Sequence, residues 1–323
     1  MPDFAVNDFL ERMFAGTTDF ALLRDELWAW QYQNNPLLQE YADGIQVSGP
    51  TSLPISFFKH FKVQSGDTWQ AQTIFESSGT TGQSPSRHYV RDLRIYEQSL
   101  LAGFHHRFAE RSYKVLALLP SYLERQTSSL VYMTKHWIET FGLPGSGFYL
   151  YNFEELKKAL VEASEAEEPI LLIGVAFALL DFVERFPLKL PADTIIIETG
   201  GMKGRKEEIV RTELHQILRE GFGVPQIHSE YGMTELLSQA YTREDGRFVC
   251  PPWMKVFTTD IHLNTLLQPL GISGRLHIVD LANIHSCAFI ATDDIGKVYA
   301  DGSFEVLGRL DTAEMRGCSL MYI

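Results

Sequence analysis

Residues Phe75–Val90 have the sequence FESSGTTGQSPSRHYV, and this stretch decides how the rest of the chain is interpreted. From Ser77 to Gly82, all six residues are glycine or carry a hydroxyl group. Glycine lets a loop turn so that its N–H groups converge on an anion, and Ser and Thr hydroxyls add donors. The segment Trp69–Phe75, WQAQTIF, predicts a strand before the loop, and Arg91–Arg111 predicts a helix after it. A strand, such a loop and a helix form a common phosphate-binding arrangement.

The loop is not a Walker A motif, which requires a glycine, four further residues and then Gly-Lys-Ser/Thr. Here Gly79 is followed by Gly82, and the loop contains no lysine. Loops of small polar residues are also ordinary surface turns. On its own the stretch therefore leaves two interpretations open, a phosphate-binding loop and a flexible turn.

The chain has 323 residues, a hydrophobic content of 45% and a net charge of −13 at pH 7, which suit one large or two modest domains. The absence of a basic run argues against nucleic acid as the main partner. Cys250, Cys287 and Cys318 have no metal-type spacing, and an odd number without a signal peptide predicts a reducing, cytoplasmic location. The longest apolar run, Ile170–Leu180, is too short to span a bilayer, so no membrane span is expected.

Apolar strands and amphipathic helices alternate after the loop, which predicts a mainly parallel sheet covered on both faces. The predicted strands are Lys114–Leu119, Phe148–Leu150, Pro169–Ile173, Thr194–Glu198 and Pro225–Ser229. The predicted helices are Ser128–Phe141, Glu154–Glu165, Ala176–Phe186 and Arg205–Glu220. Before the loop, helices are expected at Val6–Phe14 and Phe20–Tyr32, the second ended by Asn34-Asn35-Pro36, with an irregular connection over 36–68.

Beyond about residue 236 the pattern changes to short β-like runs separated by Gly and Asp turns, which predicts antiparallel β structure in a small barrel or meander. The runs are Gln239–Thr242, Arg275–Val279, Ala288–Thr292, Gly296–Tyr299 and Phe304–Leu307. The pair Asp301-Gly302 predicts a hairpin turn. We therefore divide the chain into an α/β part over 1–235, a β-rich part over 236–311 and a short tail over 312–323.

Two further stretches have chemically suggestive residues. Tyr231–Glu235, YGMTE, combines an aromatic ring, a turn glycine, a hydroxyl and a carboxylate, which suit a stacking face, a phosphate donor and a Mg²⁺ ligand. A plain strand-to-loop turn with an exposed glutamate explains it equally well. In the stretch 291–311, Asp294 and Arg309 are the polar residues that a hairpin turn alone does not explain.

Taken together and in this order, the three stretches resemble the adenylate-forming superfamily of acyl-CoA synthetases, luciferases and peptide-synthetase adenylation domains. The resemblance covers roughly residues 70–311. It implies an α/β fold of the large N-terminal type, with mainly parallel sheets covered by helices and a small antiparallel part. It also implies ATP and Mg²⁺ as cofactors and a carboxylic acid as substrate.

The resemblance assigns a role to each matching residue. Glu235 would ligate Mg²⁺, Tyr231 would lie against adenine, Thr234 would touch the α-phosphate, and Asp294 with Arg309 would bind the ribose. The β- and γ-phosphates of ATP would be held by the loop residues Ser77, Ser78, Gly79, Thr80, Thr81 and Gly82. The backbone at Gly200 and Gly201 would pass close to the adenine and acyl groups. His228 is a further candidate for lining the acyl or adenine pocket, whereas His105 and His106 are expected to be structural.

The sequence departs from the superfamily pattern in two places. The lysine that normally follows the loop is missing, and Arg87 lies displaced from its position. Only twelve residues follow the hinge-like Asp311, so we expect the usual C-terminal lid domain to be absent. The tail instead contains Cys318, which resembles the acyl-protein synthetase branch of bacterial fatty-acid reductase systems, the LuxE-like branch. In that branch the acyl group passes from the adenylate to a cysteine near the C-terminus, because a thiolate is a strong nucleophile.

Three functions remain open from the sequence. The first is an ATP-dependent acyl-protein synthetase that activates a carboxylic acid, expected to be a fatty acid, and carries the acyl group on Cys318. An acyl-accepting reductase or carrier protein would then be its partner. The second is a lid-less acyl- or aryl-CoA ligase. The third is a non-catalytic relative that binds an acyl-adenylate or a nucleotide. The alternative to a carrier role for Cys318 is that it is simply a small buried residue of the tail. Cys250 and Cys287 are expected to be structural.

Overall fold

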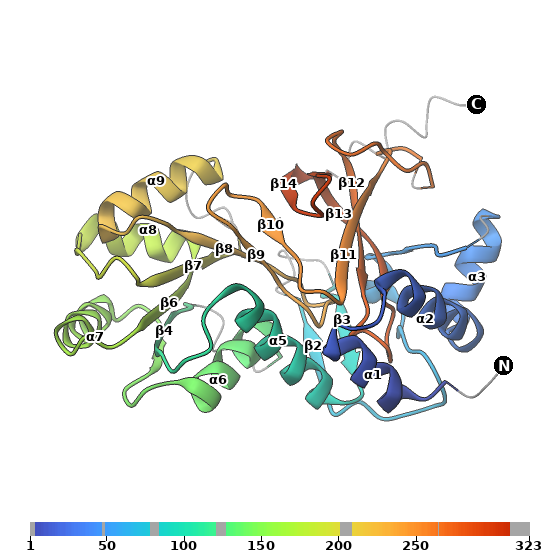
Figure 1. The fold of residues 1–323 in the computed structure, drawn as a ribbon, viewed down its shortest axis with the longest axis horizontal. Helices are drawn as coiled ribbons and strands as arrows, with labels where there is room; N and C mark the ends of the chain where they lie inside the picture. Colours follow the sequence, from blue (N-terminus) through green and yellow to red (C-terminus); the bar gives the residue numbers. More distant parts are fainter. Residues whose placement is uncertain are drawn as a thin grey trace. The chain divides into compact units, whose positions relative to one another are not determined.

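The computed structural model describes residues 4–46, 49–77, 84–120, 127–200, 209–263 and 265–310 (Figure 1). The chain divides into two units, one of residues 1–69 with 252–323 and one of residues 70–251. The sequence alone suggested divisions after residues 235 and 311. In the structure residues 236–251 group with the second unit, because the short strands in this stretch extend its sheet.

The second unit is built on a sheet whose central strands run parallel, in the order β5-β4-β6-β7-β8. These strands are β4 (Lys114–Leu118), β5 (Gly147–Tyr149), β6 (Ile170–Val175), β7 (Ile195–Thr199) and β8 (His228–Tyr231). The antiparallel strands β9 (Ala240–Thr242) and β10 (Phe248–Val249) follow β8. All six residues of β6 are buried, as a strand covered on both faces requires. The predicted mainly parallel sheet is confirmed.

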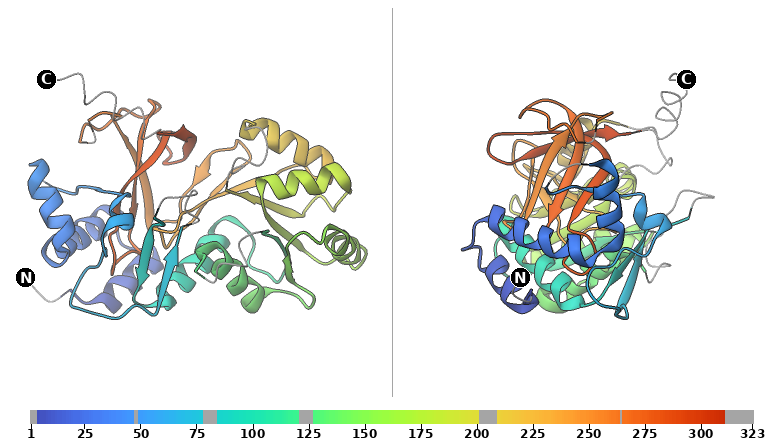
Figure 2. Two further views of the ribbon diagram at one scale, coloured as in Figure 1. Left: turned by 180° about the vertical axis from the view of Figure 1, so that it is seen from behind. Right: turned by 90° about the vertical axis from the view of Figure 1, so that its right-hand side faces the viewer.

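Helices of the second unit cover this sheet on both faces. They are α5 (Leu93–Arg107), α6 (Ser129–Phe141), α7 (Phe153–Glu165), α8 (Ala176–Arg185) and α9 (Arg211–Phe222). Figures 1 and 2 show α8 and α9 on one side of the sheet and α5 and α6 on the other. The side chains of Asp92, Ser128 and Asn152 accept main-chain N–H groups at the starts of α5, α6 and α7, which fixes where these helices begin.

Two strands of the second unit form a separate antiparallel hairpin, β2 (Thr73–Glu76) with β3 (Arg87–Val90). The Ser/Gly/Thr loop connects them. The strand β3 was not predicted, and it lies between the loop and α5, so the loop does not lead directly into a helix. The loop is consequently held at both ends by strands that pair with each other.

The first unit combines N-terminal helices with an antiparallel sheet. Its helices are α1 (Val6–Ala15), α2 (Phe20–Asn34), α3 (Pro36–Ile45) and α4 (Phe57–His60). Its strands are β1 (Leu53–Pro54), β11 (Met254–Thr259), β12 (Gly274–Asp280), β13 (Phe289–Val298) and β14 (Phe304–Arg309). Strands β11 to β14 pair antiparallel in chain order, and β1 adds to β13 in parallel. The predicted antiparallel character is confirmed.

The first unit also contains elements that the sequence analysis did not predict. Helix α3 occupies the start of the stretch expected to be irregular, and Asn35 caps it while Pro36 takes its first position. Strand β11 was not predicted, and the runs 288–292 and 296–299 belong to the single strand β13. The predicted turn at Asp301-Gly302 is confirmed, because Gly302 has a φ of 79° and Tyr299 N–H donates to the carbonyl of Ser303 (2.8 Å).

A buried amide side chain ties the N-terminal helices to this sheet. Gln31 on α2 is fully buried, and its Nε2 donates to the carbonyl oxygens of Asn283 (2.9 Å) and Ile284 (2.8 Å). Its Oε1 accepts the N–H of Ala288 at 3.0 Å. The turn that leads into β13 therefore satisfies its main-chain groups through a side chain more than 250 residues away in the sequence.

We expect the variant Gln31→Leu to lower the free energy of unfolding by about 2–4 kcal/mol, because it removes the partner of three buried main-chain groups. Urea denaturation followed by circular dichroism measures this loss. Gln33→Leu, at an exposed position of the same helix, is the matched control and should change stability by less than about 0.5 kcal/mol. Equal stabilities of the two variants would contradict the role given to Gln31.

Within the part of the chain that the structure describes, no helix has both the length and the apolar character needed to cross a membrane.

Candidate functional site

The ends of the Ser/Gly/Thr loop are closed by a pair of serines. Ser77 donates its main-chain N–H to the carbonyl of Ser86 (3.1 Å), and Ser86 donates its N–H to the Ser77 hydroxyl oxygen (2.9 Å). The Ser77 hydroxyl hydrogen can still be donated, because a serine hydroxyl both accepts and donates. The loop residues Ser78, Gly79, Thr80, Thr81 and Gly82 lie outside the described residues. We call the Ser77–Ser86 pair the loop neck.

An ion pair flanks the loop neck. Arg87 Nε lies 3.1 Å from Glu76 Oε1, across the β2–β3 register. Glu76 also donates its N–H to the carbonyl of Thr127 (2.9 Å), which joins the hairpin to the segment before α6. Arg87, which lies near the position of the missing lysine, thus pairs with Glu76 at the end of the hairpin next to the loop. Because the pair is partly exposed, its contribution to stability is small.

The end of β7 and the end of β8 form the second part of the site. The two strands are parallel neighbours with Thr199 opposite Glu230, so Gly200 and Tyr231 follow at the same edge of the sheet. Gly200 has a φ of 68°, a conformation that favours glycine. Ligands of open α/β sheets bind at this carboxyl edge. The structure thus brings together two of the predicted site residues, while Gly201 lies outside the described part.

The YGMTE stretch forms the loop that leaves β8. Tyr231 is 9% exposed, and its ring lies 5.6 Å from that of Phe248. Glu235 is 4% exposed, so it is not the exposed glutamate that a plain turn would carry. A buried carboxylate needs compensating partners, which is consistent with a defined position for this side chain.

His88 connects the YGMTE loop to the hairpin. It lies on β3, is 1% exposed, and its Nδ1 is 2.8 Å from the carbonyl oxygen of Thr234. A carbonyl can only accept, so Nδ1 is the protonated nitrogen in this contact. The hairpin that carries the phosphate-loop candidate and the loop that carries Thr234 are therefore held against each other. Sequence reasoning missed His88, because nothing in its position on a short strand marks this partner.

Glu230 is a further polar residue that the sequence analysis missed. Its Oε2 accepts the hydroxyl hydrogen of Thr199 at 2.5 Å, which links the ends of β7 and β8 by side chains. Burial, reinforced by the negative charge of Glu198, raises the pKa of Glu230 to about 7. A Cβ at Gly232 would lie 2.3 Å from Glu230 Oε1, so a side chain there would displace this carboxylate.

A second polar cluster lies on the other face of the same strands, because successive side chains of a strand alternate. Ser229 donates its hydroxyl hydrogen to Glu198 Oε1 at 2.5 Å. His215 on α9 lies 3.0 Å from the Ser229 hydroxyl and 3.4 Å from Glu198 Oε1, both measured from Nε2. Both partners approach the same nitrogen of His215, which differs from a Ser-His-acid triad, in which the acid contacts the other nitrogen. The cluster instead cross-links α9 to β7 and β8.

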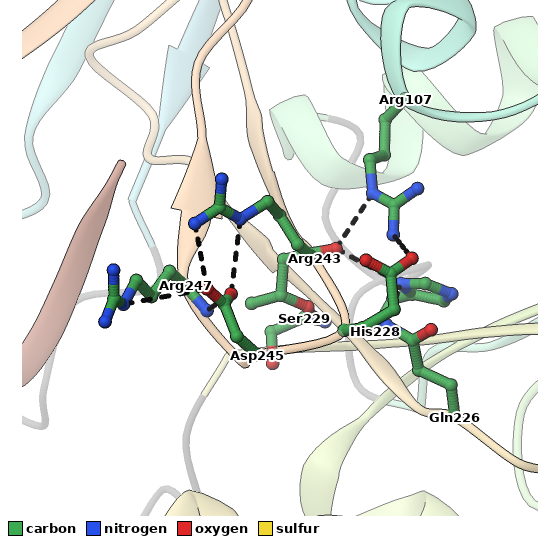
Figure 3. A network of polar contacts seen from close by, with 9 residues as sticks. Arg107, Gln226, His228, Ser229, Arg243, Asp245 and Arg247 are labelled. Atoms are coloured by element: carbon green, nitrogen blue, oxygen red, sulfur yellow. Dashed lines mark hydrogen bonds and ion pairs between the residues drawn. The ribbon is translucent and has the colours of Figure 1, made fainter. Parts of the chain in front are cut away.

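His228 belongs to a polar network that includes α5, β8 and the β9–β10 turn (Figure 3). Its Nδ1 lies 3.2 Å from the carbonyl of Thr242, to which Arg107 also donates from Nε at 3.0 Å. Arg107 pairs with Glu244 at 3.2 Å. Burial lowers the pKa of His228 to about 4, so the ring is neutral at pH 7. These contacts give His228 a structural setting, and its role as a pocket residue stays a prediction.

The residues of the expected ribose motif lie in the first unit. Asp294 on β13 faces Arg309 on β14 in the strand register, with Oδ1 and Nε 3.6 Å apart. The Asp294 N–H donates to the Thr292 hydroxyl oxygen at 3.1 Å. Arg309 is largely exposed and Asp294 mostly buried. The structure thus brings together the two residues that the sequence resemblance predicts to bind the ribose.

The cysteines differ in accessibility. Cys287 is fully buried, donates its S–H to the carbonyl of Phe289, and has a pKa raised to about 12 by burial, so it is no nucleophile at neutral pH. Cys250 is partly buried, and Cys318 and Asp311 lie outside the described residues. Among the residues that the structure does describe, no group of three or more His, Cys, Asp or Glu side chains is placed to hold a metal ion.

Known proteins match this chain in sequence. Residues 145–322 match the family model described as acyl-protein synthetase, LuxE. A Vibrio harveyi protein named long-chain-fatty-acid–luciferin-component ligase is 30% identical over 139 residues, which are 40% of this chain and 36% of that protein. The match therefore spans little more than a third of the relative's length.

Known structures match it in fold. ATP-bound MatB from Rhodopseudomonas palustris superposes with a TM-score of 0.55 at 18% identity, over 76% of this chain and 50% of its own. A 2-hydroxyisobutyryl-CoA ligase in the postadenylation state with 2-HIB-AMP superposes with a TM-score of 0.64 at 12% identity, over 94% of this chain and 68% of its own. For the long-chain-fatty-acid-CoA ligase FadD1 from Archaeoglobus fulgidus the TM-score is 0.52 at 14% identity, over 77% of this chain and 53% of its own. This chain thus spans about half to two thirds of each.

The parallel sheet, the loops at its carboxyl edge and these superpositions define the class: the chain has the α/β fold of the adenylate-forming enzymes. The family model covers more than half of the chain, and it does so across both the YGMTE loop and the 292–309 stretch. The chain belongs to the LuxE family of acyl-protein synthetases.

We expect Glu230→Gln to change how stability depends on pH. The raised pKa means that the folded protein keeps this proton up to about pH 7, whereas an unfolded glutamate loses it near 4.5. The stabilisation is complete below pH 4.5 and is lost as the pH rises through 7. Wild type should therefore lose on the order of 2–3 kcal/mol relative to the Gln variant between pH 4.5 and 8. Urea titrations at a series of pH values measure this, with Glu213→Gln on the exposed side of α9 as control. A pH-independent difference would contradict it.

Proposed function

We propose that this protein activates a carboxylic acid with ATP to an acyl-adenylate and then transfers the acyl group to Cys318. The observation that carries the proposal is the contact of His88 with Thr234, which joins the hairpin of the phosphate-loop candidate to the YGMTE loop. Membership of the LuxE family supports the reaction class. The name of the Vibrio harveyi relative supports a long-chain fatty acid as the substrate.

In this proposal the loop from Ser77 to Gly82 donates N–H and hydroxyl groups to the β- and γ-phosphates. Thr234 contacts the α-phosphate, and Tyr231 lies against the adenine. Gly200, with Gly201 after it, lets the backbone pass close to the adenine and acyl groups. Asp294 and Arg309 take the ribose hydroxyls. In this proposal the loop and Thr234 would stabilise the charge on the phosphates, and the other residues would orient the nucleotide and the acid for the transfer.

Glu235 is the residue that would hold Mg²⁺. A site built from protein side chains alone is absent from the described residues, whereas Mg²⁺ in nucleotide sites typically takes one or two carboxylates and completes its shell with phosphate oxygens and water. Glu235 would supply one such carboxylate, which fits that second arrangement. When bound, the ion would neutralise phosphate charge.

The proposed reaction has two steps. A carboxylate oxygen of the substrate attacks the α-phosphorus of ATP, an O–P bond forms, and pyrophosphate leaves with the electrons of the broken P–O bond. The thiolate of Cys318 then attacks the acyl carbon, a C–S bond forms, the bond between the acyl carbon and the phosphate oxygen breaks, and AMP leaves with its electrons. The thioester is a carrier, which makes an acyl-accepting reductase or carrier protein the natural next partner. Transfer to CoA instead of Cys318, as in a CoA ligase, is the alternative that the experiments must separate.

We expect Glu235→Gln to reduce carboxylate-dependent pyrophosphate release by about 100-fold or more, because the amide keeps the shape and removes the charge. A coupled pyrophosphate assay with a panel of fatty acids, ATP and Mg²⁺ measures the rate. Glu213→Gln serves as the control with one exposed carboxylate removed. Turnover at the wild-type rate in the Glu235 variant would remove this residue from the site.

We expect Cys318→Ser to leave pyrophosphate release intact and to abolish the hydroxylamine-sensitive acyl label on the protein. Intact-protein mass spectrometry after incubation with ATP, Mg²⁺ and fatty acids detects the label as one added acyl mass. Cys250→Ser is the matched control and should label as the wild type does. A label that persists in the Cys318→Ser variant would identify another acceptor, and AMP release that requires CoA without any label would favour the ligase alternative.

A further inference from the structure

Arg275 is a buried arginine in the first unit that the proposed reaction does not use directly. It lies on β12, and only 6% of its side chain is exposed. Its Nε donates to the carbonyl of Thr292 at 2.5 Å, and its Nη2 donates to Asp293 Oδ1 at 2.8 Å. Both acceptors immediately precede Asp294 in the chain. The guanidinium thus contacts the bulged part of β13, residues 292–294, that presents Asp294, through the two residues before it.

The same bulged part of β13 is restrained from its other sides. The Thr292 hydroxyl donates to the carbonyl of Leu276 (2.8 Å) and accepts the N–H of Asp294 (3.1 Å). The carbonyl of Asp293 accepts the N–H of Leu310, the last described residue after β14, at 2.7 Å. Among these contacts of the bulged segment, Arg275 supplies the charged donor. Its two hydrogen bonds hold the segment at two successive residues, Thr292 and Asp293.

An arginine at this place has a cost that an apolar residue would avoid. Taking a guanidinium out of water is unfavourable, and an ion pair with a partly exposed partner repays this only incompletely. Lysine would not replace it, because the two contacts use two nitrogens of one rigid planar fork. The neighbouring residues of β12 from Leu276 to Val279 are buried as well, so an apolar side chain would suit the position for packing alone. The contacts to the bulged segment of β13 are what arginine adds.

We propose that Arg275 is a positioning residue for ribose recognition, which acts on Asp294 through Thr292 and Asp293. The inference rests on the proposed function, in which Asp294 takes the ribose hydroxyls. It adds a residue outside the three matched motifs, whose side chain does not itself contact the nucleotide. Removing Arg275 should loosen the direction of the Asp294 carboxylate while leaving that carboxylate in the protein.

The test compares ATP with 2′,3′-dideoxy-ATP in carboxylate-dependent pyrophosphate release by the full chain. The ratio of the two kcat/KM values measures recognition of the ribose hydroxyls. Wild type should prefer ATP, and Asp294→Ala should abolish the preference. Arg275→Met should reduce the preference about tenfold, the size expected for a displaced charged hydrogen bond. The double variant should match Asp294→Ala, because the two residues act in series.

Matched variants separate positioning from stability. Ile278→Ala removes a buried side chain of the same strand, so it should lower thermal stability and leave the ATP preference unchanged. Asp293→Asn removes the charge that Arg275 contacts, is tolerated more easily at a partly exposed site, and should reduce the preference as Arg275→Met does. Arg275→Lys should restore only part of it.

The outcomes decide the inference in either direction. A full ATP preference in Asp293→Asn and in Arg275→Lys would overturn it while leaving the proposed function intact. A preference that falls equally in Ile278→Ala would also overturn it, since general destabilisation would then explain the effect. Pyrophosphate release without any ribose preference in wild type would overturn it together with the ribose role of Asp294. No release with any fatty acid would instead overturn the proposed function itself.

Discussion

The parallel register of β7 and β8 is the constraint on which the candidate site depends. With Thr199 opposite Glu230, the chain leaves both strands at the same edge, and Gly200 and Tyr231 become neighbours without any contribution from ligand. The Thr199–Glu230 hydrogen bond maintains this register from one face of the sheet. A slip of one residue would turn every side chain to the opposite face and separate the two loops.

Polar side chains maintain this edge from both faces of the sheet, and they come from the end of β7 and from β8 itself. Glu198, Ser229 and His215 connect α9 to the two strands on one face, and Glu230 lies on the other. Buried polar groups of this kind cost free energy unless every partner is present. Arg275 in the first unit follows the same principle on an antiparallel sheet. In both units the polar contacts lie next to the residues proposed to meet the nucleotide, and the hydrophobic core supplies the rest of the stability.

Much of the architecture could be predicted because it depends on local patterns. The run Ile170–Ile173 is apolar throughout and became a central strand, and the turn at Asp301-Gly302 formed as its chemistry requires. The strand β3 escaped prediction because its four residues become a strand only by pairing with β2. His88 and Gln31 could not be identified at all, since their partners are main-chain groups far away in the sequence. Motifs reveal which residues meet a ligand, whereas the residues that hold those motifs in place depend on the tertiary fold.

The loop neck has a consequence for the evolution of the loop that it closes. Ser77 and Ser86 are joined by two hydrogen bonds, and β2 and β3 pair beyond them. The pairing of the hairpin strands therefore offsets the entropy cost of bringing the loop ends together. Closing entropy grows only with the logarithm of loop length, so insertions or exchanges among the eight residues between these serines cost the fold little. The fold therefore places little constraint on the sequence of this loop, and the constraint comes instead from the phosphates that the loop is proposed to hold.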